Sequence, residues 1–312
     1  MGRFRSFGAY MRQRFGATVY KVNVDAGFTC PNRDGTLGVR GCIYCNNDSF
    51  RPDSCRPTLS VSNQIATGIA HVEKRYGAHM FLVYFQPYTN TYAPVEQLEA
   101  LFKEALAEPS VAGLAIGTRP DAIDSEKLDM LEALASKYFI LIEYGLQSIY
   151  DKSLKFINRG HDYQTFLTAL EMTRGRGINI GAHIIAGFPT ETKTETLAMA
   201  EELSSLPIEF LKIHQLQVVK DTPLAELYMK EPFHVFEYRE YLDFLADFIE
   251  RLSPDIVLQR LFATAPDDIL IAPLWGRNRH QILNDIEKNL EARGSYQGKK
   301  YKATVAPRST AS

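Results

Sequence analysis

The chain of 312 residues carries a formal net charge of −2, is 45% hydrophobic and is 23% charged, an ordinary mixture for a globular protein. No apolar stretch approaches the roughly 18 residues that a membrane span needs, and the Arg-rich N-terminus lacks the apolar centre of a secretory signal. Three of the four cysteines lie on one segment, which fits a reducing compartment better than a disulfide framework. We therefore expect a cytoplasmic protein without membrane association.

Basic residues are concentrated at the two ends of the chain. Residues 1–21 and 293–312 together contain ten Lys or Arg residues and no acid, whereas residues 22–292 hold 25 basic and 37 acidic side chains. Two basic ends on an acidic body suit a polyanion such as RNA. Solvated basic termini without any partner are the alternative interpretation.

Strands and helices alternate along the first two thirds of the chain. Short runs rich in β-branched and aromatic residues predict strands, and longer segments with helical periodicity and capping residues predict helices. The predicted strands are 20–25, 80–85, 111–116, 138–146, 179–186 and 210–218. The predicted helices are 6–15 (a short basic helix or arm), 60–76, 94–107, 125–136, 151–157, 163–176 and 194–206.

Six alternations argue for parallel βαβ units, so the expected fold is α/β, a partial TIM-like (β/α)6 barrel. We place the barrel at residues 20–219, after a basic N-terminal arm at 1–19. An α/β extension at 220–292 contains a long helix at 233–252, a strand at 256–264 and a helix at 276–292. A flexible basic tail is expected at 293–312. In barrels of this kind the chemistry gathers at the C-terminal ends of the strands.

A loop rich in Gly, Pro, Asn and Asp follows the first predicted strand and holds Cys30, Cys42 and Cys45. Eleven residues separate the first two cysteines, and two separate the second pair. Three thiols on one loop suit a soft metal centre. An iron–sulfur cluster with three cysteine ligands leaves one iron open, and S-adenosylmethionine offers an amine and a carboxylate to chelate it. The alternative is structural zinc with Cys55 as fourth ligand, which the single C-x-x-C pair disfavours.

The cysteine loop, with its long first gap, resembles that of the YhcC/YtqA-type radical SAM proteins, relatives of the Elongator catalytic subunit. Matching stretches extend to residues 272–275, so the resemblance covers nearly the whole chain. The common radical SAM loop has a first gap of three residues, and the gap of eleven matches this family. The resemblance implies a [4Fe-4S] cluster on Cys30, Cys42 and Cys45 that cleaves S-adenosylmethionine to a 5′-deoxyadenosyl radical, with an external donor of the flavodoxin or ferredoxin type.

The resemblance also places cofactor contacts around the loop. It puts the ring of Tyr44 beside the adenine, with loop packing as an equal alternative. It puts Arg159 near the carboxylate of S-adenosylmethionine, a group that suits a guanidinium. The segment after the second strand occupies the place where relatives bind the amino group of the cofactor; its candidates are Gln86, Tyr88, Thr89 and Asn90.

Glu143 and Gln147 lie four residues apart on a predicted strand, so both side chains point the same way, into the barrel. A carboxylate inside a strand needs a partner. That partner is a ribose hydroxyl or the aminium of the cofactor or, in a structural ion pair, a histidine or one of Arg159 and Arg260.

His183 and His214 lie on the fifth and sixth predicted strands. Histidines in such strands are commonly satisfied core residues. Because these strands face the lumen where the active site is expected, contact with the substrate or the adenine is an equal alternative.

We expect a monomeric or weakly associating radical SAM enzyme, and the resemblance points to a tRNA wobble uridine whose C5 substituent it alters. The Elongator acetyltransferase domain has no counterpart in the chain, so acetyl-CoA-dependent chemistry is not expected. Two alternatives stay open: radical modification of a small metabolite or protein, and a zinc-stabilised RNA-binding adaptor without catalysis.

Overall fold

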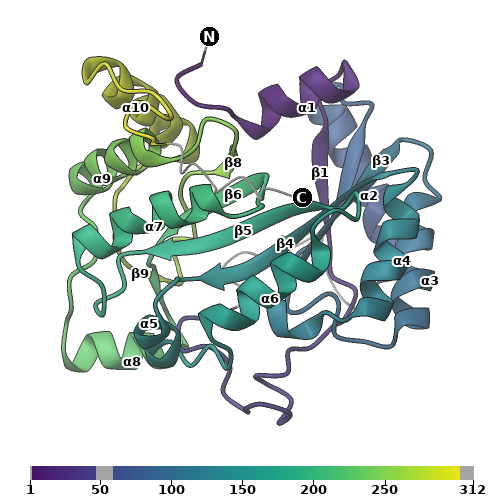
Figure 1. The fold of residues 1–312 in the computed structure, drawn as a ribbon, viewed down its shortest axis with the longest axis horizontal. Helices are drawn as coiled ribbons and strands as arrows, with labels where there is room; N and C mark the ends of the chain where they lie inside the picture. The colour runs from purple at the N-terminus through teal and green to yellow at the C-terminus, as the bar shows by residue number, and fades with distance from the viewer. Residues whose placement is uncertain (1, 47–58, 303–312) are drawn as a thin grey trace, which may run out of the picture.

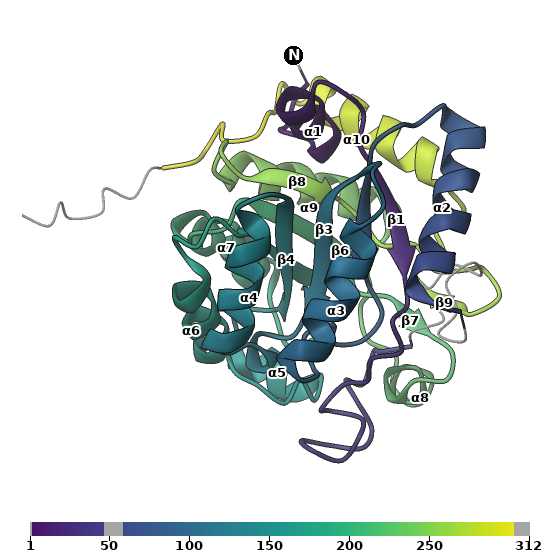
Figure 2. The same cartoon turned by 90° about the vertical axis from the view of Figure 1, so that its right-hand side faces the viewer.

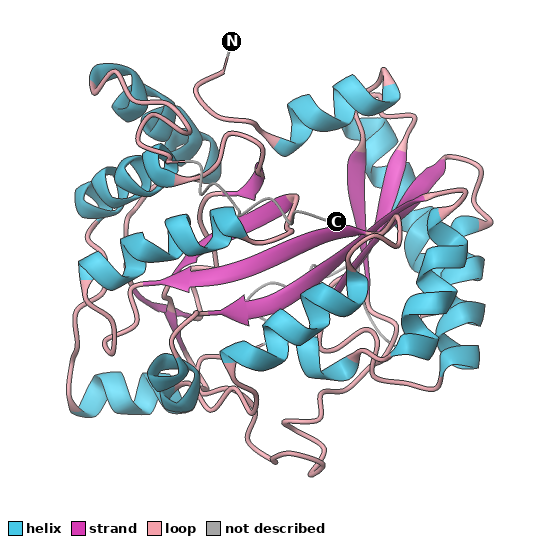
Figure 3. Ribbon diagram, in the orientation of Figure 1, coloured by secondary structure: helices cyan, strands magenta, loops and turns pink. Residues whose placement is uncertain are grey.

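The computed structural model of this protein describes residues 2–46 and 59–302. Seven parallel strands form one curled sheet in the order β1-β2-β3-β4-β5-β6-β8, with helices on its outer face (Figures 1 and 3). The predicted α/β fold with a TIM-like partial barrel is confirmed, with one more strand in the sheet than expected. The strands are β1 (Tyr20–Val24), β2 (Phe81–Phe85), β3 (Val111–Thr118), β4 (Phe139–Gln147), β5 (Asn179–Ala186), β6 (Phe210–Gln215) and β8 (Val257–Arg260).

The helices that cover the outer face begin at capping residues that the sequence displays. The side chains of Asp124, Asp162 and Thr192 each accept a hydrogen bond from the backbone three residues ahead, which satisfies a free N–H of the first turn. The outer helices are α2 (Val61–Tyr76), α3 (Val95–Leu106), α4 (Ser125–Ala135), α5 (Asp151–Phe156), α6 (Tyr163–Thr173), α7 (Lys193–Ser205) and α9 (Tyr238–Arg251); a 3-10 turn, η2 (Pro120–Ala122), precedes α4.

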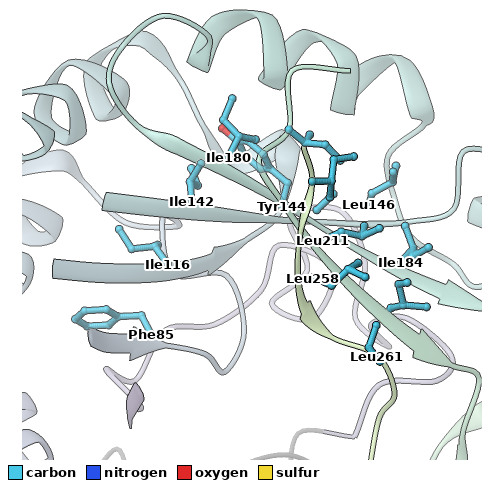
Figure 4. Packing of buried hydrophobic residues seen from close by; sticks show 14 of the residues in the cluster. Phe85, Ile116, Ile142, Tyr144, Leu146, Ile180, Ile184, Leu211, Leu258 and Leu261 are labelled. Atoms are coloured by element: carbon cyan, nitrogen blue, oxygen red, sulfur yellow. The ribbon is translucent and has the colours of Figure 1, made fainter. Parts of the chain in front are cut away.

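The main hydrophobic core lies between the sheet and these helices. Successive side chains of a strand point to opposite faces, so alternate residues such as Ile116, Ile142 and Tyr144 point outward into this core (Figure 4). The residues between them point into the lumen, and at several of those positions the side chain is small or absent, as at Ala115, Gly117 and Gly145. The lumen therefore has room for a ligand on one side of a fully packed sheet.

The N-terminal helix α1 (Phe7–Phe15) closes the lumen at the N-terminal ends of the strands. Its Met11 is fully buried in an apolar layer with lumen-facing side chains such as Phe210 and Phe139, the first residues of β6 and β4. Phe7 packs edge-on against Phe210, and Phe15 against Phe139. The predicted helix at 6–15 is confirmed, and its apolar face forms a plug beneath the barrel.

The C-terminal extension completes the sheet. Strand β8 pairs in parallel with β6, so the strand predicted at 256–264 belongs to the barrel. The strand predicted at 210–218 is two elements: β6 ends at Gln215, and β7 (Val218–Val219) forms a separate antiparallel pair with β9 (Leu270–Ala272). Helices α8 (Pro223–Lys230) and α10 (Arg279–Ala292) complete the extension.

The expectation of a flexible tail from Arg293 is wrong for residues 293–302. The side-chain amide of Gln297 donates to the carbonyl oxygens of Ser253 and Ile256, and its backbone N–H donates to the carbonyl of Arg3 at 2.9 Å. Lys300 forms an ion pair with Glu250. Polar contacts between distant residues produce no hydrophobic periodicity, so the sequence does not reveal that residues 293–302 are held in place.

Residues 2–15 and 293–302, the described parts of the two basic segments outside β1, therefore meet at one end of the barrel. In Figure 2, α1 and α10 lie at the end of the strands opposite to the cysteine loop and α8. Among residues 2–46 and 59–302, no helix combines the length and apolar character that crossing a bilayer requires.

Candidate functional site

A cavity of about 230 Å³ lies at the C-terminal ends of the strands, between the cysteine loop and the lumen. The sequence predicted thirteen site residues, and twelve of them line this cavity. They come from the loop after β1, from the ends of β2, β4, β5 and β6, and from the turn after α5. They are Cys30, Cys42, Tyr44, Cys45, Gln86, Tyr88, Thr89, Glu143, Gln147, Arg159, His183 and His214.

The cysteine loop is shaped by its own backbone hydrogen bonds. The carbonyl of Cys30 accepts from the N–H groups of Arg33 and Asp34, and the carbonyl of Cys42 accepts from the N–H of Cys45 at 3.0 Å. Gly41, between the two turns, has a φ of 70°, a left-handed conformation that glycine adopts without strain. These turns present all three free thiols to the same cavity.

Two side chains donate hydrogen bonds to the sulfur of Cys42. Arg159 Nη1 lies 3.5 Å from Sγ, and Asn32 Nδ2 lies 3.8 Å from it. The other terminal nitrogen of Arg159 donates to the carbonyl of Gly145 at 2.6 Å. A Cβ atom at position 145 would lie 2.7 Å from that nitrogen, so glycine on β4 makes room for the guanidinium. Arg159 Nε is buried without a hydrogen-bond partner among the described residues.

Arginines supply the positive charge that a set of thiolates needs. Burial and the neighbouring Cys42 raise the pKa of the Cys45 thiol, while Arg33 opposes this shift. Burial disfavours the charge of Arg159, but the proximity of Cys42 and Tyr44 outweighs it and raises the pKa of that guanidinium. Three thiols flanked by two arginines fit a cluster that binds through deprotonated cysteines.

A single zinc ion fits these residues less well. Within the described part of the chain, no three His, Cys, Asp or Glu side chains gather as one metal ion requires. Cys55, the fourth ligand of the zinc hypothesis, lies outside the described residues. The donor set therefore fits a larger cluster on one cavity wall better than one tetrahedral ion.

The segment after β2 divides into cavity-lining and structural residues. Gln86, Tyr88 and Thr89 line the cavity, and the hydroxyl of Thr89 is buried without a hydrogen-bond partner among the described residues. Asn90 does not line it. Its side-chain amide donates to the carbonyls of Phe85, Pro87 and Gly117. This amide holds the turn against the end of β3, and the contact of Asn90 with the cofactor stays a prediction.

Glu143 is the centre of a buried ionic network. The fully buried carboxylate accepts hydrogen bonds from Lys21 Nζ at 3.1 Å, from Lys212 Nζ and from His183 Nε2 at 3.0 Å. Burial alone would raise the pKa of Glu143, but the charges of Lys21 and Lys212 outweigh it and hold that pKa well below its usual range. The sequence left open a hydroxyl or the aminium of the cofactor and a structural ion pair as partners of Glu143. The structure shows an ion pair with Lys21 and Lys212 and a hydrogen bond from the neutral ring of His183.

The two lysines of this network were missed in the sequence. Lys212 lies two residues before His214 on β6, on the same face, so strand alternation marks it as lumen-facing. Lys212 Nζ also donates to the hydroxyl of Tyr84 at 2.7 Å. No sequence pattern links Lys21 to Glu143, which lies 122 residues away.

The two histidines lie side by side above this network. Their ring centroids are 6.1 Å apart, and His214 Nε2 is buried without a hydrogen-bond partner among the described residues. Burial, followed by the charge of Lys212, lowers the pKa of His183 to about 4. Burial and Arg260 lower the pKa of His214 well below its usual value. Both rings are therefore neutral at physiological pH.

The sequence matches two family models over most of its length. Residues 34–203 match the Radical SAM superfamily, and residues 208–292 match the Radical_SAM C-terminal domain. The chain belongs to the radical SAM superfamily. It therefore carries the cofactors of that superfamily, a [4Fe-4S] cluster and S-adenosylmethionine, and the three-thiol loop and its arginines are the part of this chain suited to hold them.

Relatives of this radical SAM protein extend over nearly the full chain. YtqA of Bacillus subtilis is 33% identical over 95% of this chain and 92% of its own length. YhcC of Escherichia coli strain K12 is 34% identical over 92% of both chains. The resemblance to YhcC/YtqA-type proteins is thus confirmed.

Relatives of the Elongator type match a smaller share of this sequence. The tRNA uridine(34) acetyltransferase of Methanocaldococcus infernus is 24% identical over 60% of this chain and 35% of its own length. The structure of Elp3 from the same archaeon superposes with a TM-score of 0.71 at 18% identity. That superposition covers 89% of this chain and 64% of the Elp3 chain, so the likeness establishes the shared fold.

Proposed function

We propose that this radical SAM enzyme modifies the wobble uridine of tRNA at its base substituent. The observation that carries the proposal is the similarity, over 60% of the chain, to a protein named for its action on tRNA uridine 34. The shared fold with archaeal Elp3 supports it. The cluster, when bound, supplies the electron that cleaves S-adenosylmethionine into methionine and a 5′-deoxyadenosyl radical.

The residues of the cavity then have separate tasks. Cys30, Cys42 and Cys45 hold the cluster, and Arg159 and Arg33 neutralise the negative charge of the thiolates. Gln86, Tyr88, Thr89 and Gln147, at the strand ends, offer polar groups to S-adenosylmethionine, and Tyr44 offers an aromatic face. The enclosed lumen beneath them keeps water from a reactive intermediate.

The path for RNA along the basic ends stays a prediction from the sequence. Among the described residues, α1 and the segment 293–302, whose Gln297 contacts Arg3, lie at the opposite end of the barrel from the cysteine loop (Figure 2). Several of their charges are also engaged: Arg3 lies 3.9 Å from Glu291, and Arg293 pairs with Asp243 at 3.2 Å. The exposed Arg40, on the cysteine loop itself, is a nearer contact for a tRNA phosphate, which binds mainly through Arg and Lys.

The test is mass spectrometry of tRNA nucleosides from a strain that lacks the gene. We expect one modified wobble nucleoside to disappear and its precursor to accumulate. Complementation with the wild-type gene should restore it, whereas Cys42→Ala should not. An unchanged nucleoside profile would exclude tRNA and favour a small molecule or protein as the substrate.

A further inference from the structure

The floor of the cavity is lined by more positive than negative side chains. Lys212 and Arg260 line it, and Lys21 reaches the same network from β1. Glu143 is the one carboxylate in this group among the described residues. Its two oxygens are already shared between Lys21, Lys212 and His183.

Arg260 is the cation that this network leaves uncompensated. It lies at the end of β8, beside Lys212 in the strand register. No hydrogen bond or ion pair joins its side chain to another described residue. Its charge nevertheless acts on the neighbours, because it lowers the pKa of His214, second only to burial. The floor therefore keeps at least this one positive charge without a counter-charge among the described residues.

The floor lies within reach of the proposed reaction. Glu143 is two residues deeper along β4 than Gly145, whose carbonyl accepts from the same Arg159 that contacts Cys42. Two residues of a strand correspond to roughly 6.6 Å. A molecule of a few carbon atoms therefore spans the distance between the floor and the level of the cysteine loop.

We propose that the floor is a binding site for an oxyanion, a carboxylate or phosphate group, on the part of the substrate that enters the barrel. Arg260 is its principal contact, and Lys212 and the buried Nε2 of His214 lie beside it. Arg260 is half-buried and has no carboxylate partner among the described residues. An oxyanion in the cavity would supply the counter-charge that is missing at this position. The proposal rests on the proposed function only in assigning the oxyanion to the substrate.

This site is tested by thermal unfolding of the cluster-reconstituted protein in the presence of malonate or inorganic phosphate. Chloride at the same ionic strength is the reference. At about ten times its dissociation constant, a bound anion should raise Tm by about 3 °C. The larger of the two responses tells whether the floor takes a carboxylate or a phosphate. No stabilisation by either anion beyond that of chloride would overturn the proposal.

Arg260→Gln should abolish the stabilisation, and Arg260→Lys, which keeps the charge, should retain part of it. The first variant should fold, because removing Arg260 leaves no carboxylate unpaired. Arg239→Gln removes the same charge from the exposed surface of α9 and should bind the anion like wild type. Equal losses in the Arg239 and Arg260 variants would show a non-specific salt effect and refute the site.

The anion could instead occupy the position of the cofactor's own carboxylate. Saturating S-adenosylmethionine distinguishes the two, because it should leave the anion-dependent rise in Tm intact if the floor is separate. Loss of that rise would assign Arg260 to the cofactor and overturn the proposal. None of these readouts depends on tRNA, so an unchanged nucleoside profile would refute the proposed function and leave the oxyanion site standing.

Discussion

The guanidinium of Arg159 lies 3.5 Å from the sulfur of Cys42 and is buried. Arg119 holds the backbone of Arg159 in this position, because its Nη1 donates to the carbonyl of Arg159 at 2.8 Å. Hydrogen bonds and positive charge at a cluster sulfur favour the reduced, more negative form. We therefore expect Arg159 to raise the reduction potential of a cluster bound at Cys42, and its contact with the cofactor carboxylate stays a prediction.

Arg159→Met should lower the reduction potential of the reconstituted cluster, because it removes both the donor and the charge beside Cys42. EPR-monitored redox titration measures this directly, and iron content shows whether the cluster still assembles. Arg174→Met, on the exposed end of α6 with a partner on its own helix, is the matched control. Equal reduction potentials in the wild type and in Arg159→Met would show that Arg159 does not influence the cluster potential.

Each of Cys30, Cys42 and Cys45 should be essential for the cluster, whereas Cys55 should not be. Alanine at any of the first three positions is expected to reduce bound iron severely after anaerobic reconstitution, because too few thiolates remain. Cys55→Ala should retain about four irons per chain. Iron analysis and the visible spectrum provide the measurement, and a colourless Cys55→Ala protein would show that the three-ligand assignment is wrong.

Glu143→Gln should destabilise the protein by about 3–5 kcal/mol, because the lysines would then be buried without a counter-charge. Glu209→Gln, at an exposed residue whose carboxylate accepts a backbone hydrogen bond, should cost less. Denaturant unfolding compares the two variants. The affinity for S-adenosylmethionine, measured on the same samples, tests whether Glu143 contacts the cofactor. Unchanged affinity in Glu143→Gln would exclude that contact.

Stability should fall as the pH drops from about 6.5 towards 4. The folded pKa of His183 is about 4, below the ordinary value near 6.5. In this interval the unfolded chain binds the proton and the folded chain does not, so the stability present at pH 7 is lost on acidification. His183 alone should contribute a loss of about 2 kcal/mol between pH 7 and pH 4.5, and His214, whose folded pKa is also lowered, adds to it.

His183→Gln should flatten this part of the stability–pH profile, as measured by urea unfolding at each pH. Glu143 adds a further loss at lower pH, because its own folded pKa is depressed and its stabilising charge disappears only when it is protonated. The two contributions therefore separate along the pH axis. An equally steep fall in the His183 variant would assign the effect to other groups.

Met11→Ala should lower the free energy of unfolding by about 2–5 kcal/mol, the usual cost of a cavity in a core. Gln13→Ala, on the exposed side of the same helix, should be nearly neutral. The measurement is denaturant unfolding of both variants. A neutral Met11→Ala would show that α1 is dispensable. We expect instead that deleting residues 1–14 destabilises the barrel, since it removes the plug.

Local sequence patterns were sufficient for most of the fold. Alternating apolar residues indicate strands, and capping residues such as Asp124 and Thr192 indicate helix starts. Both signals depend only on residues a few positions apart in the sequence, so they can be read without the tertiary structure. The cysteine spacing brought three thiols to attention for the same reason, because Cys30, Cys42 and Cys45 lie within one loop after β1 and line the same cavity. Strand alternation also placed His183, His214 and Glu143 correctly in the lumen.

Long-range partnerships were decided by the tertiary structure alone. Whether Glu143 meets a ligand or a lysine depends on which strands curl together, and Lys21 reaches it only because the sheet closes. The position of the tail is fixed by the amide of Gln297, a polar contact without periodicity. Sequence determines what each residue can bind, but burial in a common cavity, which sets the cost of an unpaired charge, arises only when distant segments fold together.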